Sequence, residues 1–377
     1  MSKLQKNPFK FGDPVEGDYY LPHTALSKTV AQFLENRIHV VLIGPRRFGK
    51  TSFVLDLLKN FEKKGYVALF VDIFNITSHR DFLQQMIRAL KEKKRLRHFI
   101  TDFLSSIPSL RPKISADFDD HTGKPSFEFT LDKASQKDVK EAIQDLLSGL
   151  EKMGSPVILA IDEFQKIAQI DDKGWLEATL RTHMQQMKTT SFLFTGSRRS
   201  IIYDMLNNQS RPLYRSCQPI EFPVFGQEFT DWIVQRFAEV GIDCDRHGIE
   251  RLRELVKDTP NYVQMVCFHL IFQGKKQIHM HDIEKCLEMV VRQNVYAYQT
   301  LLNSLSATQQ RALRLAAKEN RQIFAKDLLA KFEIASGPAL ASALKALKDK
   351  GILDEEGTSK GKVIFDDPLF ALWLKSI

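Results

Sequence analysis

The feature that most limits how this chain can fold is residues 44–51, which read Gly-Pro-Arg-Arg-Phe-Gly-Lys-Thr. This stretch fits the pattern G-x-x-x-x-G-K-[ST] of a phosphate-binding loop. An apolar run at residues 38–43 precedes it, and residues 52–64 after it have helical spacing. A strand, a glycine-containing turn and a helix in this order predict backbone amides that point inward and bind an anion.

The residue types within this stretch predict a nucleotide site. Gly44 and Gly49 permit backbone geometry that a β-carbon obstructs. Lys50 is expected to reach the β- and γ-phosphates, and the Thr51 hydroxyl to coordinate Mg²⁺. We therefore expect ATP and Mg²⁺ as ligands, with the nucleotide bound by Gly44, Pro45, Arg46, Arg47, Phe48, Gly49, Lys50, Thr51 and Ser52.

A second candidate site follows the apolar run at residues 157–161, which ends in Asp162 and Glu163. Apolar residues ending in Asp-Glu, about 110 residues after a phosphate-binding loop, are typical of a Walker B strand. Asp162 is expected to hold Mg²⁺ through water, and the Thr51 hydroxyl is the second expected ligand. Glu163 is expected to take a proton from the attacking water or to orient it.

A third candidate lies at residues 195–199, after the next apolar run. A strand inserted between the two strands above places a polar side chain near the γ-phosphate, and Ser197 is the first choice, with Thr195 second. Lys50, Asp162, Glu163 and Ser197 are thus the predicted catalytic residues. Four arginines are candidates to neutralise the transition state, within the chain or on a neighbouring subunit: Arg198, Arg199, Arg211 and Arg215.

Strands alternate with helices over residues 1–225, which predicts an α/β fold with a parallel sheet and helices on both faces. Residues 113–131 break the alternation and suggest a hairpin insertion at about 110–135. The expected strands are 38–43, 66–72, 157–162, 191–195 and 220–224, and the expected helices are 24–35, 52–64, 80–96 and 175–188.

The rest of the chain follows a different pattern. Residues 227–298 are predicted to be helical throughout, with breaks near Gly241, Thr259-Pro260 and Gly274. The segment 301–377 combines three helices with two strands, which is the pattern of a winged helix-turn-helix. Its helices are expected at 307–319, 325–332 and 338–350, and its strands at 351–353 and 362–365.

These motifs together resemble the archaeal-type ATPases, P-loop proteins related to AAA+ proteins and to the signal-transduction ATPases with numerous domains. The resemblance rests on residues 44–52, Asp162-Glu163-Phe164-Gln165, Gly196-Ser197 and Asp367-Pro368-Leu369-Phe370, with residues 7–9 and 14–15 as lead-in. It implies an AAA+-like ATPase core (1–225), a helical lid (226–300) and a winged-helix domain (301–377).

The resemblance also implies a lid motif of proline beside an aromatic residue. Pro260-Asn261-Tyr262 matches it, which adds Pro260 to the expected nucleotide-binding residues. Two positions depart from the family. Residues 19–26 lack its usual arginine and acidic residue, and Asn261 stands where many AAA+ lids carry a sensor arginine.

Composition excludes several classes of protein. Of the 377 residues 43% are hydrophobic and 27% charged, as in ordinary globular proteins. No run reaches the roughly 18 uncharged apolar residues of a membrane helix, and the first residues lack the apolar region of a secretory signal. None of the four cysteines forms a C-x-x-C pair, which favours free thiols in a reducing cytoplasm.

Charge does not decide the function. The net charge is +8, and residues 1–100 carry 18 basic against 9 acidic residues, so the basic field lies in the N-terminal third. One hypothesis is an ATP-hydrolysing molecular switch, of slow turnover, that signals to a protein partner or through self-association. The alternative is a DNA-binding ATPase of the replication-initiator or transposition-helper type, which contacts phosphates through Lys345, Lys348, Lys360 and Lys362. A nucleotide-binding scaffold without turnover is a third possibility, against which Glu163 argues.

Overall fold

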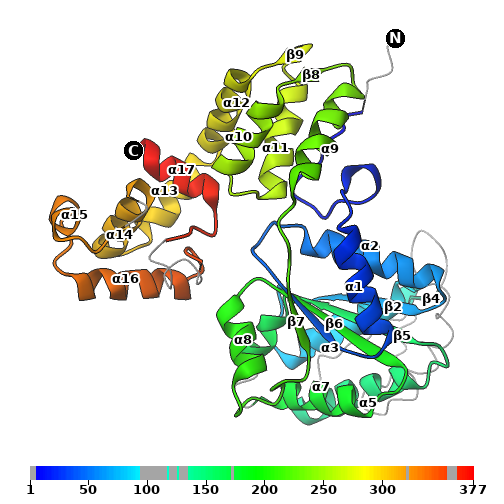
Figure 1. The fold of residues 1–377 in the computed structure, drawn as a ribbon. Coiled ribbons are helices and arrows are strands. Elements are labelled where there is room, and N and C mark those ends of the chain that lie inside the picture. The colour runs from blue at the N-terminus through cyan, green and yellow to red at the C-terminus, as the bar shows by residue number, and fades with distance from the viewer. Residues whose placement is uncertain are drawn as a thin grey trace. The chain divides into compact units, whose positions relative to one another are not determined.

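The computed structural model describes residues 6–93, 135–170, 174–319, 322–354 and 363–377, and the backbone of 117–118 and 125–126. Contacts divide these residues into two compact units. We call the described part of Pro22–Gly44 and Lys50–Phe222 the sheet unit. The described part of Met1–Leu21, Pro45–Gly49 and Pro223–Ile377 forms the helical unit. Figure 1 shows the elements of both.

A five-stranded parallel sheet, in the order β2-β5-β6-β1-β7, organises the sheet unit. Every residue of β1, β5 and β6 is buried, as expected of strands that are covered on both faces. Because β6 lies between β1 and β5, the predicted insertion of one strand between the two motif-bearing strands is confirmed. The strands are β1 (Val40–Ile43), β2 (Val67–Asp72), β5 (Val157–Asp162), β6 (Thr190–Gly196) and β7 (Gln218–Glu221).

Helices cover both faces of this sheet (Figure 1). Phe192 of β6 belongs to the apolar core shared with α3, α5 and α7, whereas Ser191, on the opposite face, donates a hydrogen bond to Leu34 O of α1. Capping boxes begin α3 at Ser78 and α5 at Ser135. The helices are α1 (Thr24–Glu35), α2 (Lys50–Lys63), α3 (His79–Lys91), α5 (Gln136–Glu151), α6 (Ile167–Ile170), α7 (Trp175–Gln186) and α8 (Arg199–Asn207), with a 3-10 turn at Phe164–Lys166.

The expected hairpin insertion is present in the described backbone as two short antiparallel strands, β3 (Asp117–Phe118) and β4 (Pro125–Ser126). The remainder of the predicted 110–135 segment lies outside the described residues.

In the helical unit, residues 226–303 form five helices among the described residues. The prediction of helix throughout was wrong at one place, because residues after the breaks near Gly241 and Gly274 form a parallel two-residue pair, β8 (Asp243–Cys244) with β9 (Gln277–Ile278). Such short strands carry too few residues to show a period of two. The helices are α9 (Gln227–Ala238), α10 (Arg246–Leu255), α11 (Pro260–Ile271), α12 (Met280–Gln293) and α13 (Val295–Asn303).

The winged-helix segment has the three predicted helices, α14 (Ala307–Lys318), α15 (Lys326–Lys331) and α16 (Gly337–Asp349). The wing is represented by an antiparallel bridge between Leu353 and Phe365, and residues 355–362 lie outside the described part. A further helix, α17 (Pro368–Ser376), was not predicted.

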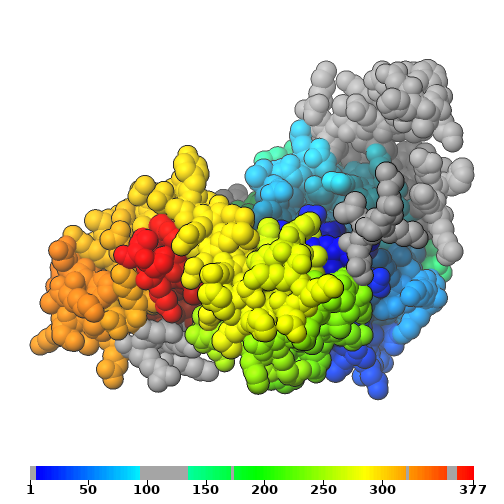
Figure 2. Space-filling view, turned by 90° about the horizontal axis from the view of Figure 1, so that it is seen from above, coloured from blue at the N-terminus to red at the C-terminus, as the bar shows by residue number. Residues whose placement is uncertain are grey.

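The helix α17 packs against α12, α13 and α14, and Figure 2 shows it in red between yellow and orange helices. Lid and winged-helix residues consequently share one apolar core, which also contains Phe9 of the N-terminal lead-in. A 3-10 turn at Gly17–Tyr19 is the regular element of that lead-in. Among the described residues, no helix combines the length and apolar composition needed to span a membrane.

Candidate functional site

The loop predicted to bind phosphate begins directly after β1, and α2 begins at Lys50. A β-carbon on Gly44 would lie 2.8 Å from Cβ of Phe222, closer than real β-carbons approach one another. Gly49 has φ +89°, a conformation that favours glycine. Both glycines of the motif are therefore required by the backbone geometry, as the sequence predicted.

Lys50 has only 5% of its surface exposed. Its Nζ donates a hydrogen bond to the carbonyl of Gly44, 2.7 Å away. A buried ammonium group is costly unless negative charge approaches it. The loop therefore fits an anion such as a phosphate. Ser52, two residues further along α2, is buried as well.

The two predicted magnesium residues meet, although 111 positions separate them. Thr51 Oγ1 donates a hydrogen bond to Asp162 Oδ2 over 2.7 Å, and Thr195 Oγ1 donates to Asp162 Oδ1. Hydroxyl and carboxylate oxygens are the ligands that Mg²⁺ prefers, and it usually takes few of them from protein. The hydroxyl of Thr51 and the carboxylate of Asp162 fit that pattern.

Glu163 follows with a left-handed backbone, φ +60°. Its Oε2 accepts hydrogen bonds from two side chains, Ser197 Oγ at 3.1 Å and Gln165 Nε2. The predicted sensor Ser197 thus lies beside the predicted base, while the second choice, Thr195, is fully buried against Asp162. Sequence reasoning assigned no role to Gln165; its place two residues after the Walker B pair was the available signal.

Two of the four candidate arginines are held by carboxylates of the sheet unit. Arg199 Nη2 lies 2.8 Å from Glu221 Oε2, and Arg211 pairs with Glu177, which is 1% exposed. Arg198 is the residue before α8. Arg215 is exposed, with φ +50°.

The loop that carries Arg215 is fixed by a neighbouring side chain. Arg181 Nη1 donates hydrogen bonds to Pro212 O, to Tyr214 O at 3.0 Å and to Ser216 Oγ at 3.0 Å. Arg215 is the most exposed of the four arginines. Which arginine acts stays a prediction.

Within the helical unit, Arg47 of the loop makes two contacts that the sequence did not reveal. Its guanidinium lies 5.0 Å from the ring centroid of Tyr262, two residues after Pro260, and its Nη1 lies 3.4 Å from Asp367 Oδ2. Pro260 is the buried first residue of α11. The lid motif named by the resemblance therefore lies close to a loop residue.

Asp367 also caps α17, accepting hydrogen bonds from the amides of Leu369 and Phe370. Burial raises the pKa of this carboxyl, and the charge of Arg47 opposes that shift. Burial likewise raises the pKa of Asp366, with Arg46 and Arg47 opposing it. Both loop arginines thus lie in the field of two winged-helix carboxyls.

The predicted DNA-contacting lysines are only partly described. Lys345 is exposed on α16 and Lys348 is half-buried, whereas Lys360 and Lys362 lie outside the described residues. Leu340, Leu344 and Leu347 are buried on the opposite side of α16.

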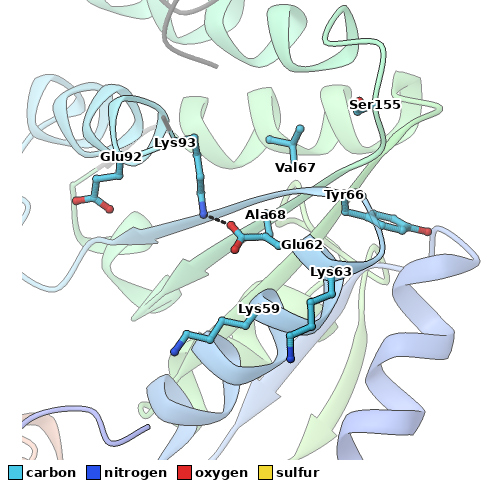
Figure 3. Close-up of a pocket in the computed structure, with 10 residues that line it drawn as sticks. Lys59, Glu62, Lys63, Tyr66, Val67, Ala68, Glu92, Lys93 and Ser155 are labelled. Atoms are coloured by element: carbon cyan, nitrogen blue, oxygen red, sulfur yellow. Dashed lines mark hydrogen bonds and ion pairs between the residues drawn. The ribbon is translucent and has the colours of Figure 1, made fainter. Parts of the chain in front are cut away.

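A cavity of about 840 Å³ lies away from these groups, where α2 ends and β2 begins (Figure 3). The phosphate-binding loop follows the carboxyl end of a parallel strand, whereas Val67 and Ala68 of this cavity lie at the amino end of β2. Lys93 pairs with Glu62 at its wall. The cavity therefore belongs to the edge of the sheet opposite the candidate site.

Residues 28–266 match a family described as an ATPase domain predominantly from Archaea, and residues 296–376 match a probable winged helix domain. Two uncharacterized ATP-binding proteins of Methanocaldococcus jannaschii, MJ0439 and MJ0074, are 27% and 29% identical over 136 and 138 residues. These alignments cover 35% and 36% of this chain and 36% and 37% of the relatives. The chain thus spans little more than a third of the length of each.

Three solved structures share the fold. The Walker-type ATPase of Pyrococcus abyssi has a TM-score of 0.65 at 20% identity, over 99% of both chains. The ORC2 protein of Aeropyrum pernix, in ADPNP-ADP complexes, has a TM-score of 0.59 at 16% identity, over 95% of this chain and 94% of that one. The ORC1 protein of the same organism, in complex with DNA, has a TM-score of 0.51 at 14% identity, over 95% and 94%. The predicted α/β P-loop fold with a C-terminal winged helix is confirmed.

Proposed function

Because the chain belongs to the family of ATPase domains found predominantly in Archaea, we propose that it binds ATP with Mg²⁺ at residues 44–52 and hydrolyses it. The observation that carries the proposal is the hydrogen bond of 2.7 Å between Thr51 and Asp162. It brings a phosphate-binding loop and an acidic strand end together as an oxygen-ligand pair.

Each residue of the site has a task in this reaction. The loop amides and Lys50 bind the phosphates, and Ser197, whose hydroxyl donates a hydrogen bond to Glu163, is proposed to detect the γ-phosphate. Glu163 accepts a proton from the attacking water. Thr51 and Asp162 would hold Mg²⁺, which when bound would supply positive charge that stabilises the transferring phosphate.

The output of the reaction is proposed to be a slow molecular switch that signals to a protein partner or to a second copy of the chain. Support comes from Tyr262 and Asp367, which contact Arg47 of the loop from the lid and winged-helix parts of the helical unit. We expect nucleotide binding at the loop to alter these contacts of Arg47, and through them the conformation of the lid and the winged helix. We retain the division into core 1–225, lid 226–300 and winged helix 301–377 as part of this proposal.

A phosphate-release assay tests hydrolysis. Glu163→Gln is expected to lose about 10²-fold or more in turnover, because the general base is removed, while ATP binding is retained. Glu141→Gln, on the exposed face of α5, is the matched control and should behave as wild type. Equal turnover in wild type and Glu163→Gln would contradict an enzymatic role.

A second candidate function is a DNA-binding ATPase, favoured by the exposed Lys345 on α16 and the basic N-terminal third of the chain. It predicts affinity for duplex DNA that falls steeply with salt. Fluorescence anisotropy of a labelled duplex should then show weaker binding for Lys345→Glu than for the control Lys326→Glu on α15. Absence of duplex binding at low salt would remove this candidate.

A further inference from the structure

The carboxylate of Glu163 is held asymmetrically. Both hydrogen-bond donors that reach it, Ser197 Oγ at 3.1 Å and Gln165 Nε2, bind the same oxygen, Oε2. Across the described part of the chain, no donor is directed at the other oxygen, Oε1. One oxygen of the proposed base is therefore occupied, and the second is available to a water molecule.

Gln165 occupies a space made for it. Its side chain is 2% exposed, and a β-carbon on Gly196 would overlap its Oε1 atom and lie 2.5 Å from Cδ1 of Ile202. The strand end of β6 thus accommodates the amide only because residue 196 is glycine.

The amide is also an expensive choice for that space. Among the described residues its buried Oε1 has no hydrogen-bond partner, and an unpaired buried acceptor destabilises the folded state. An apolar side chain of similar size avoids that cost. What the amide adds is the hydrogen bond from Nε2 to Glu163, so this contact explains its presence best.

We propose that Gln165 is a positioning residue for hydrolysis: it fixes Oε2 of Glu163 so that Oε1 faces the attacking water. This inference rests on the proposed ATPase function. The water oxygen attacks the γ-phosphorus and its proton passes to Oε1, while the bond to the bridging oxygen breaks and that electron pair leaves with ADP. Gln165 touches neither water nor nucleotide and acts only through Glu163.

The test is a double-mutant cycle with Gln165→Leu and Glu163→Gln. Gln165→Leu alone is expected to lower kcat roughly tenfold to hundredfold, a part of what a general base supplies, with KM for ATP unchanged. In the Glu163→Gln background the same change should lower the residual turnover no further. Gln264→Leu, another buried glutamine, which bonds to the lead-in of the helical unit, is the control and should leave kcat unchanged.

Two further readouts separate positioning from a structural role. The calorimetric ATP affinity of Gln165→Leu should stay within about twofold of the wild-type value, as for a change confined to the reacting groups. Its melting temperature should not fall, because leucine avoids the unpaired buried acceptor.

Unchanged kcat in Gln165→Leu would overturn the inference, as would additive losses in the double mutant or a parallel fall in ATP affinity and melting temperature. If Glu163→Gln is inactive, those results contradict the role of Gln165 but not the proposed ATPase function. Turnover that does not depend on Glu163 would instead overturn the proposed function, and the inference with it.

Discussion

His39, the residue before β1, shows how a single side chain couples the fold to pH. The amide of Phe192 lies 3.2 Å from its Nδ1, and the carbonyl of Met184 lies 3.1 Å from its Nε2. An amide donates and a carbonyl accepts, so the ring is neutral, with its proton on Nε2. A second proton on Nδ1 would face an N–H group, and burial already lowers the pKa of His39.

We predict that acid destabilises the sheet unit through this residue. Because the folded-state pKa lies below the unfolded value, the unfolded chain binds the proton first, and stability falls as pH drops below the ordinary histidine range. The melting temperature should therefore fall more between pH 7.5 and pH 5.5 in wild type than in His39→Gln, which can form both hydrogen bonds without titrating. Equal falls in both proteins would contradict this account.

At the scale of elements, the strands were the most predictable part. Apolar runs such as 157–162 are buried on both faces, so continuous hydrophobicity was a sufficient signal for them. The helix α17 was not predicted, because the residues from Asp367-Pro368 onward were interpreted only as a motif of the family resemblance. Its capping aspartate and first-turn proline are nevertheless ordinary signals of a helix start.

The cap of α17 leads to a prediction about ATP affinity. Asp367→Asn keeps an oxygen that can cap the helix but removes the negative charge 3.4 Å from Arg47. The freed positive charge of Arg47 should then strengthen ATP binding, by at most about fivefold, because partly exposed ion pairs contribute about 0–1 kcal/mol. Calorimetry should show this gain in Asp367→Asn but not in Asp327→Asn on α15, and weaker binding would contradict the assignment.

At the scale of the whole molecule, contacts assign Gly44 and Lys50 to the sheet unit and Pro45–Gly49 to the helical unit. The meeting of Thr51 with Asp162 was predictable, because both positions belong to motifs whose chemistry requires it. The contacts of Tyr262 and Asp367 with Arg47, and the fit of Gln165 against Gly196, were not predictable, since each depends on a neighbour that is remote in sequence.

The central claim is that residues 44–51 bind the triphosphate of a nucleotide, and a calorimetric titration with Mg·ATP tests it most directly. Lys50 is the buried cation of this loop, with its ammonium 2.7 Å from Gly44 O. Wild type should bind ATP, and Lys50→Ala should show no measurable binding while its melting temperature stays close to that of wild type. The same affinity in both proteins would mean that ATP binds elsewhere or through other residues, and would contradict the account.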